Sequence, residues 1–190
     1  MQLEVEIKAW VRDQKRLEHN LTTVGASVSK SFEKVDSYFR YSRENIEHDV
    51  RIRGNDGTFV VTYKDKTITD GLEVNQEHEF TVSDPAPMGE LLVRLGARPL
   101  IEKHKIGALW KLPDSDLNIE ISEVSDLGIF VEIEAILDPH LISEAQRRFL
   151  VTESERTIRT LLSKLEIPAR DIEARTYTSM LLEKQRTGTL

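Results

Sequence analysis

The sequence predicts an α+β fold: a closed antiparallel barrel of eight strands with a charged interior and helices packed outside. Three observations support this prediction. About eight short segments alternate between polar and apolar residues, as β-strands do. Only a few segments have the spacing of amphipathic helices. The polar faces of the strands carry charge in strand after strand, which a solvent-facing sheet does not require.

The chain opens with a strand and a helix. Over residues 3–8 the side chains alternate strictly between two faces of the strand. The apolar face holds Leu3, Val5 and Ile7, and the charged face holds Glu4, Glu6 and Lys8. A helix follows, because Asp13 is a suitable N-cap, apolar residues recur at helical spacing, and Gly25 suits the end.

The middle of the chain contains most of the strands, and turn residues separate them. The predicted strands cover residues 35–41, 49–53, 59–64, 75–82, 100–111, 118–124 and 129–137. The stretch Gly54-Asn55-Asp56-Gly57 predicts a tight hairpin. Asp84, with prolines close behind it, predicts the start of a helix that ends at Gly96.

After residue 138 the apolar spacing becomes helical. Thr152-Glu-Ser-Glu155 has the form of a capping box, so we expect a helix to begin there. A last helix is expected over residues 174–184. We expect these C-terminal helices, about residues 140–185, to pack on the barrel and the whole chain, residues 1–190, to form a single domain.

Composition excludes several classes of function. The net charge of −7 argues against nonspecific binding to nucleic acid or to an anionic membrane. The chain has no cysteine, so disulfides, thiolate chemistry and cysteine-ligated metals are excluded. The N-terminus does not resemble a signal peptide, and no apolar run approaches the length needed to cross a membrane. We therefore expect a soluble, cytoplasmic protein whose partner is a small molecule.

The alternation of the first strand returns in the later ones, and the charges are sorted by sign within each strand. The carboxylates of these faces are Glu4, Glu6, Glu77, Glu79, Glu120, Glu132 and Glu134. The cationic residues are Lys8, Arg51, Arg53, Lys64, Lys103 and Lys105. One interpretation is a half-exposed sheet with solvated charges. Cross-strand charge pairs, however, contribute only about 0.2–1 kcal/mol each, so stability gives little reason for such sorting.

A barrel with its charged faces turned inward explains the pattern better. A dry interior is excluded, because desolvation costs several kcal/mol per ion. Grouped carboxylates favour a hard cation such as Mg²⁺ or Mn²⁺ between them. Six cationic side chains opposite them favour a ligand with several negative charges, such as a phosphate chain. No GxxxxGK[ST] loop occurs, so side chains would hold the phosphates.

These residues resemble a known family. The opening Glu4-x-Glu6-x-Lys8 is similar to the ExExK signature of the CYTH superfamily, the triphosphate tunnel metalloenzymes. The later matching segments, in family order, are Asp36-Ser-Tyr38-Phe39, Arg51-Ile-Arg53, Thr62-Tyr63-Lys64, Glu77-His-Glu79, Lys103 and Leu127-Gly128-x-Phe130-Val131-Glu132-Ile133-Glu134. Residues 175–182 resemble the branch of class IV adenylyl cyclases and thiamine triphosphatases. The resemblance covers nearly the whole chain.

The resemblance implies roles for the charged residues. Divalent metal, Mg²⁺ or Mn²⁺, would be bound by Glu4, Glu6, Glu132 and Glu134. The triphosphate would be held by Lys8, Arg51, Arg53, Lys64 and Lys103. Glu77 and Glu79 would brace these basic residues from across the tunnel, which is a structural role more than a catalytic one.

The chain departs from the family pattern at two positions. Lys105 stands where the family usually has an arginine, which keeps the charge and loses the bidentate fork. Ser122 stands where the family usually has an aspartate metal ligand. Glu120 lies on the same face and is our substitute ligand, with Glu123 as a further candidate if the register slips by one residue.

Three functions remain open. We favour metal-dependent hydrolysis of a triphosphate, whether inorganic, thiamine or nucleoside, with Lys8 and Lys64 making the contacts that matter in the transition state. The first alternative is a class IV adenylyl cyclase that converts ATP to cyclic AMP and pyrophosphate. The second is a non-catalytic module that binds polyphosphate or nucleotide. Dimers are common among relatives, so a homodimer is compatible with the resemblance.

Overall fold

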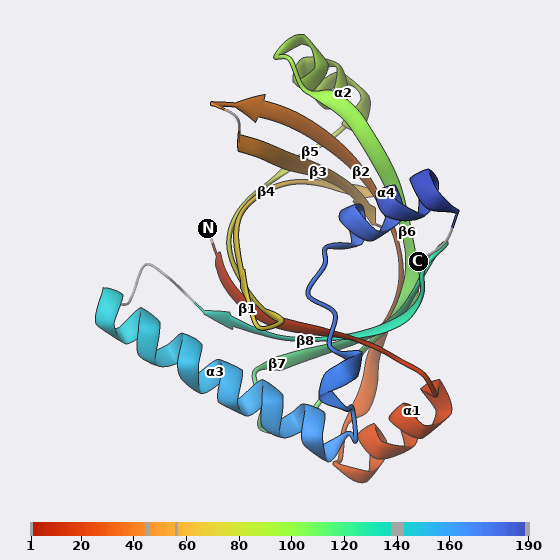
Figure 1. The fold of residues 1–190 in the computed structure, drawn as a ribbon, viewed down its shortest axis with the longest axis vertical. Coiled ribbons are helices and arrows are strands. Elements are labelled where there is room, and N and C mark those ends of the chain that lie inside the picture. Colours follow the sequence, from red (N-terminus) through yellow and green to blue (C-terminus); the bar gives the residue numbers. More distant parts are fainter. Residues whose placement is uncertain (1, 45, 56, 138–142, 189–190) are drawn as a thin grey trace.

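The computed structural model describes residues 2–44, 46–55, 57–137 and 143–188, and it confirms the predicted fold class. Eight antiparallel strands form a closed barrel, which Figure 1 shows nearly end-on. The strands are β1 (Gln2–Trp10), β2 (Ser27–Arg43), β3 (Ile46–Asn55), β4 (Thr58–Thr69), β5 (Leu72–Val82), β6 (Arg98–Lys111), β7 (Leu117–Val124) and β8 (Gly128–Leu137). Around the barrel their order is β1-β5-β4-β3-β2-β6-β7-β8.

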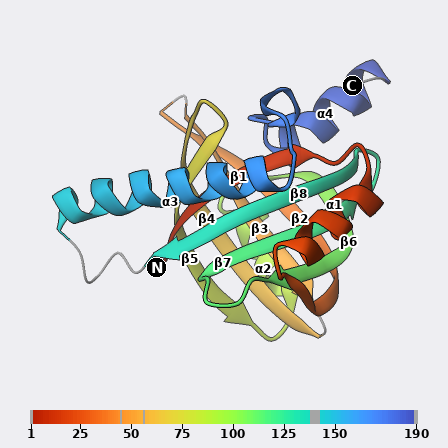
Figure 2. The same ribbon diagram turned by 90° about the horizontal axis from the view of Figure 1, so that it is seen from below.

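In the described parts of the chain, four α-helices and a 3₁₀ helix accompany the barrel. They are α1 (Gln14–Thr23), α2 (Pro85–Arg94), α3 (Glu144–Lys164), η2 (Ala169–Asp171) and α4 (Tyr177–Thr187). Figure 2 shows α1 and α3 along the outside of β1, β7 and β8, and Figure 1 shows α2 on the opposite side of the barrel. No helix within the described parts of the chain is long and apolar enough to cross a membrane.

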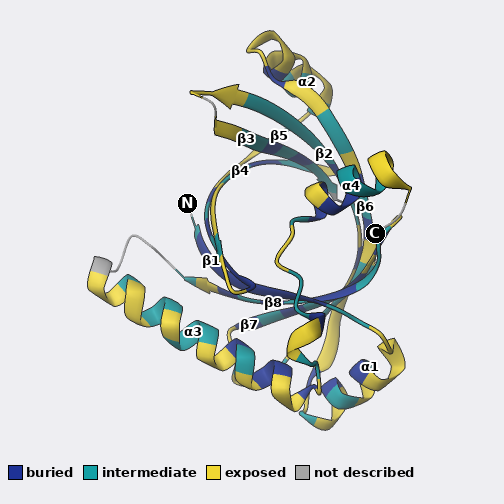
Figure 3. Ribbon diagram, in the orientation of Figure 1, coloured by how far each residue is buried: buried dark blue, intermediate teal, exposed yellow. Residues whose placement is uncertain are grey.

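The main hydrophobic core lies outside the barrel. The outward side chains of β1, β7 and β8, among them Val5, Ile119 and Ile133, are fully buried and cluster with Leu21 of α1 and Ile158 of α3. Full burial of such a side chain contributes about 1.5–3 kcal/mol. Figure 3 shows the dark colour of buried residues along these strands and on the helix sides that face them. The strands therefore use their apolar faces to hold the helices, and their other faces are left for the interior.

Two helix boundaries differ from the prediction. Helix α3 begins at Glu144, where Ser143 and Gln146 form the capping box, and Thr152 lies inside the helix. The prediction that a helix begins at Thr152 was therefore wrong. No proline or glycine interrupts residues 144–151, so the helix continues from the earlier cap.

The last helix begins at Tyr177, three residues later than the predicted start at 174. The segment before it is held by β1 and by its own side chains, so it cannot join the helix. The backbone N–H of Glu173 donates to the carbonyl oxygen of Lys8, and the N–H of Arg175 donates to the Glu173 carboxylate. Thr176 then caps the helix with its hydroxyl.

The ends of α1 and α2 follow the prediction closely, whereas β2, β3 and β4 are longer than predicted. Asp13 and Asp84 are the N-caps of α1 and α2, and Gly25 and Gly96 follow these helices with positive φ. The strand predicted over residues 35–41 extends in both directions as β2. The predicted hairpin joins β3 to β4, and its Asp56 lies outside the described residues.

Candidate functional site

The inward faces of the strands line a cavity of about 630 Å³ inside the barrel. All eleven residues predicted for the site lie on its wall: Glu4, Glu6, Lys8, Arg51, Arg53, Lys64, Lys103, Lys105, Glu120, Glu132 and Glu134. Glu77 and Glu79 also line it. Ser122 does not line it: the residue packs against Gly107, and its hydroxyl is buried without a hydrogen-bond partner among the described residues. The barrel therefore brings together the residues that sequence alternation selected.

The order of the strands divides this wall into two halves of mainly opposite charge. Strands β4, β3, β2 and β6 are neighbours, and they carry the inward Lys64, Arg51, Arg53, Lys34, Lys103 and Lys105. Strands β7, β8, β1 and β5 are neighbours too, and they carry the inward Glu120, Glu132, Glu134, Glu4, Glu6, Glu73, Glu77 and Glu79. We call these the basic half and the acidic half. The buried exceptions are Asp36 in the basic half and Lys8 in the acidic half, and three less buried carboxylates, Glu47, Asp49 and Asp65, also line the basic half.

In the acidic half, three carboxylates meet. One oxygen each of Glu4, Glu6 and Glu134 lies within 4.8 Å of the other two. Glu6 is placed between strands, opposite Glu134 on β8 and opposite Glu73 on β5. We call Glu4, Glu6 and Glu134 the carboxylate triad.

Burial raises the pKa of each carboxyl group in the triad. For Glu6 the pKa lies well above its usual value, because desolvation adds to repulsion from Glu132 and Glu73. For Glu134, desolvation and then Glu4 raise the pKa, and for Glu4 desolvation outweighs the opposing effect of Lys64. A divalent cation would remove this repulsion, and three carboxylate oxygens are the donors that Mg²⁺ or Mn²⁺ prefers. The residues present therefore fit such an ion.

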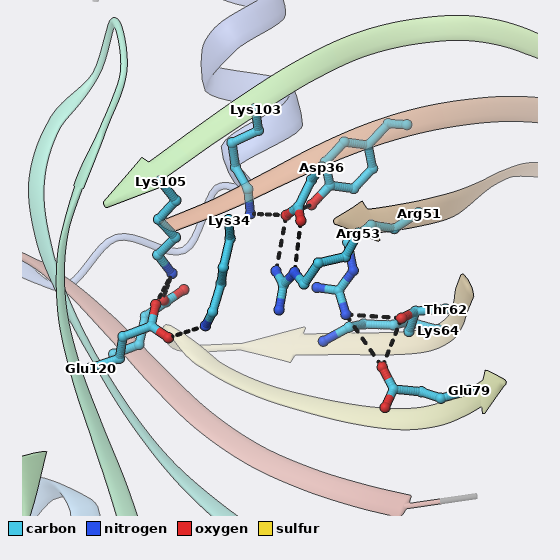
Figure 4. A network of polar contacts seen from close by, with 12 residues as sticks. Lys34, Asp36, Arg51, Arg53, Thr62, Lys64, Glu79, Lys103, Lys105 and Glu120 are labelled. Carbon is cyan, nitrogen blue, oxygen red and sulfur yellow. Dashed lines mark hydrogen bonds and ion pairs between the residues drawn. The ribbon is translucent and has the colours of Figure 1, made fainter. Parts of the chain in front are cut away.

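In the basic half, one buried carboxylate organises the cations. Asp36 is fully buried and accepts two hydrogen bonds from the Arg53 guanidinium, at 2.6 and 2.9 Å. Its second oxygen also lies 3.0 Å from Nζ of Lys103 (Figure 4). Burial alone would raise the pKa of Asp36, but Lys103 and Arg53 outweigh it and hold the pKa well below its usual range. Asp36 therefore fixes the position of two of the predicted phosphate-binding side chains.

The residues predicted as braces contact the cations as expected. The Arg51 guanidinium donates to the Thr62 hydroxyl at 2.9 Å and lies 3.4 Å from Glu79, which also accepts from Thr62 (Figure 4). The ammonium group of Lys64 forms ion pairs with Glu77 and, at 3.1 Å, with Glu4. Lys64 thereby connects the basic half to the carboxylate triad.

A third cluster lies where β2 and β6 face β7 and β8. The ammonium group of Lys105 lies between the carboxylates of Glu120 and Glu132, and Lys34 forms an ion pair with Glu120 (Figure 4 labels Lys34, Lys105 and Glu120). We call Lys34, Lys105, Glu120 and Glu132 the four-charge cluster. Two of the predicted metal ligands are therefore paired with lysines here.

Helix α4 contributes to the wall at one end. Figure 1 shows α4 and the segment before it in front of the barrel opening. The ring of Tyr177, the first residue of α4, lies 4.5 Å from Nζ of Lys8, 4.8 Å from that of Lys103 and 5.1 Å from that of Lys105. Lys8 also donates to the backbone carbonyl of Arg175 at 2.6 Å. Burial lowers the pKa of Lys8.

Sequence reasoning did not assign a site role to four of these residues. Asp36 lies within the predicted strand over residues 35–41 and could have been found from its alternation, and Lys34 could have been found by extending that strand toward its N-terminal end. Glu73 could have been found in the same way on β5, where it precedes Glu77 and Glu79 on one face. Tyr177 comes from a helix, so strand alternation offers no signal for it.

Comparisons with known proteins agree with this architecture. A family model described as the CYTH domain matches residues 2–177. A protein of Methanocaldococcus jannaschii, named provisionally as an adenylate cyclase, is 32% identical over 135 residues, which cover 70% of this chain and 76% of that protein. A solved structure from Pyrococcus horikoshii OT3 has a TM-score of 0.76 at 25% identity and covers 93% of this chain and 98% of its own.

A further solved structure, from Hippeastrum, is described as a proposed adenylyl cyclase with a dominant triphosphatase activity. It has a TM-score of 0.63 at 16% identity, with coverage of 100% of this chain and 97% of its own. At this level of identity the likeness concerns the fold alone.

Proposed function

Since the chain belongs to the CYTH domain family, we propose that it hydrolyses the phosphoanhydride bond of a small triphosphate in the barrel cavity, with the help of a divalent metal ion. The observation that carries the proposal is the division of the cavity wall into an acidic and a basic half. A triphosphate has charged oxygens along its length. It can face cationic side chains on one side and a carboxylate-bound metal ion on the other.

The residues of the basic half would hold the phosphates. Arg51 and Arg53 offer planar guanidinium groups that match phosphate oxygens, and Lys64 and Lys103 offer point charges. Asp36, Glu77 and Glu79 keep these groups in place before the ligand arrives, so little reorganisation is needed at the moment of reaction. Lys64 and Lys8 are placed beside the carboxylates, where they would contact the oxygens of the phosphoryl group that is attacked.

Glu4, Glu6 and Glu134 would hold the divalent ion. When bound, such an ion neutralises phosphate oxygens and acts as a Lewis acid toward them. Between those three carboxylates and the cationic side chains, a water molecule can approach the terminal phosphorus while charge on the leaving phosphate is stabilised by Lys and Arg. Phosphate release follows from cleavage of the terminal P–O bond.

Adenylyl cyclase activity is the second candidate, and the name of the Methanocaldococcus relative favours it. In that reaction the ribose 3′-hydroxyl of ATP attacks the α-phosphorus and pyrophosphate leaves. The same arrangement of cations serves both reactions, since the difference lies in which phosphorus is placed beside the metal ion and the nucleophile. We favour hydrolysis because the wall is charged along its length and, among the described lining residues, offers few apolar side chains for a base.

The test is product analysis. Purified protein is incubated with Mg²⁺ or Mn²⁺ and with inorganic triphosphate, thiamine triphosphate or ATP in parallel reactions. The same reactions are run with a Glu4→Gln/Glu6→Gln variant and with a Glu102→Gln control. The control changes an exposed carboxylate of β6. We expect orthophosphate release that the double substitution lowers by at least about 100-fold and the control leaves unchanged.

The other outcomes are equally informative. Cyclic AMP with pyrophosphate would establish the cyclase and contradict our preference. Thermal stabilisation by triphosphate without turnover of any substrate would contradict both enzyme reactions and leave a binding module.

A further inference from the structure

We propose that this cavity takes up a single divalent ion, at Glu4, Glu6 and Glu134, because the ammonium groups of Lys105 and Lys34 occupy the place of a second ion beside Glu120 and Glu132. The inference rests on the proposed function only in assuming that the cavity takes up a divalent ion. It differs from the sequence-based prediction, which assigned Glu120 and Glu132 to the metal as well.

The geometry of the four-charge cluster carries the first step. Lys34 and Lys105 are register partners on β2 and β6, so their side chains leave neighbouring strands side by side. Glu120 and Glu132 are register partners on β7 and β8 in the same way. Lys105 reaches both carboxylates, and Lys34 reaches the second oxygen of Glu120. Two positive and two negative charges thus compensate one another within the cluster.

The position of Lys105 is the one that a bridging cation would take. Its ammonium group contacts one oxygen of Glu120 and one of Glu132, and its side chain is only 4% exposed. An ammonium is a compact charge with three donors, so it can substitute for a small cation between two carboxylates. The Tyr177 ring covers it on another side, 5.1 Å away.

The carboxylate triad differs in this respect. Among the described side chains, neither Glu6 nor Glu134 forms an ion pair, and Glu4 shares Lys64 with Glu77. Asn118 donates one hydrogen bond to Glu134 at 2.7 Å, which adds no charge. Within the described residues, the three carboxylates of the triad are compensated only by Lys64, which they share with Glu77. The two carboxylates of the four-charge cluster are compensated by two lysines.

A second ion would have to displace a buried ammonium group. Lys105 would then lose both of its acceptors while remaining in a buried position, where an uncompensated charge is strongly unfavourable. An ion entering the triad competes only with Lys64 for Glu4, and Lys64 then keeps Glu77 as an acceptor. Binding of an ion between Glu120 and Glu132 therefore requires displacement of the Lys105 ammonium group, whereas binding at the triad does not.

The experiment counts bound metal without using turnover. Mn²⁺ alone is titrated into the full chain by isothermal titration calorimetry, and free Mn²⁺ is counted by electron paramagnetic resonance. We expect one ion per chain for the unchanged protein and for a Lys15→Met control on the exposed side of α1. We expect two ions per chain for Lys105→Met, since this substitution leaves Glu120 and Glu132 with only Lys34.

Two ions bound by the unchanged protein would overturn the inference, and so would a single ion bound by a Lys105→Met protein that keeps its circular dichroism spectrum. Absence of Mn²⁺ binding would overturn it as well.

If Lys105→Met does not fold, the inference is tested by comparing Mn²⁺ binding to the Glu120→Gln and Glu134→Gln variants. We expect the Mn²⁺ dissociation constant to rise more than about tenfold for Glu134→Gln and less than about threefold for Glu120→Gln. Equal weakening by both substitutions would contradict the proposal.

The outcome separates this inference from the proposed function. One Mn²⁺ per chain without turnover of any triphosphate would leave the inference standing and overturn the hydrolase. Two Mn²⁺ per chain with triphosphate turnover would overturn the inference and leave the hydrolase standing.

Discussion

The two halves of the cavity wall solve the problem of buried charge in different ways. In the basic half, Asp36 compensates Arg53 and Lys103, so these cations are paired within the protein. In the acidic half, Glu6 and Glu134 have no ion pair among the described residues, and burial raises their pKa values. The buried charges of Arg53 and Lys103 are therefore compensated without a ligand, whereas the carboxylate triad is stabilised only when a cation is added. Four predictions test this comparison.

The largest expected effect concerns Asp36. Asp36→Asn removes the charge that compensates Arg53 and Lys103 in a fully buried position, so we expect a loss of about 3–5 kcal/mol in the free energy of unfolding. Asp49→Asn is the matched control, since Asp49 also binds an arginine, Arg40, with both oxygens, but is 28% exposed. The control should lose about 1 kcal/mol or less. Equal losses in urea denaturation would show that Asp36 does not organise the basic half.

The next effect concerns metal addition. Without a divalent ion the triad is repulsive, so Mn²⁺ should raise the free energy of unfolding by about 2.7 kcal/mol at one hundred times its dissociation constant. The increase should disappear in Glu6→Gln and on addition of a chelator. Thermal denaturation with and without Mn²⁺ measures it, and an equal increase in the variant would place the ion elsewhere.

A smaller effect of opposite sign is expected for Glu6→Gln in the absence of metal. The amide removes one of three converging charges, and the neighbouring carboxylates of Glu134 and Glu73 can accept its hydrogen bonds. We expect a gain of about 1 kcal/mol, or about 2–4 °C in the melting temperature for a chain of this size. Asp36→Asn and Glu6→Gln should therefore change stability in opposite directions, although each removes one buried carboxylate. A loss of stability in Glu6→Gln would contradict the comparison.

The smallest effect is a pH dependence. The folded-state pKa of Glu6 lies above that of the unfolded chain, so its charge destabilises the fold, and this cost appears as the pH rises above about 4.5. The stabilisation by Glu6→Gln should then be larger at pH 7.5 than at pH 4.5 in metal-free buffer. Asp36 has a lowered pKa, so its contribution is present above the unfolded value of 3.8 and is lost as the pH falls below it. Urea denaturation at several pH values measures both, and a pH-independent Glu6→Gln difference would refute the first.

Much of the fold and site could be predicted because strand alternation is a local property. A period of two assigns every residue of a strand to one face or the other, and a slip by one residue would place Ile133 in the cavity and Glu134 in the core. The thirteen charged residues predicted for the interior all line the cavity for this reason. Helix caps are weaker local signals, since Thr152 and Ser143 both offer a suitable pattern and only the second begins a helix.

The sequence by itself determined which side chains face the interior and that their charges are sorted within each strand. Only the tertiary structure decided which of them meet. Barrel closure pairs β1 with β8 and so brings Glu4 and Glu6 to Glu134, more than a hundred residues later. It also places Asp36 between Arg53 and Lys103, and Lys105 between Glu120 and Glu132. Local sequence spacing does not predict the order of strands around a barrel, because that order depends on how strands distant in the sequence pair.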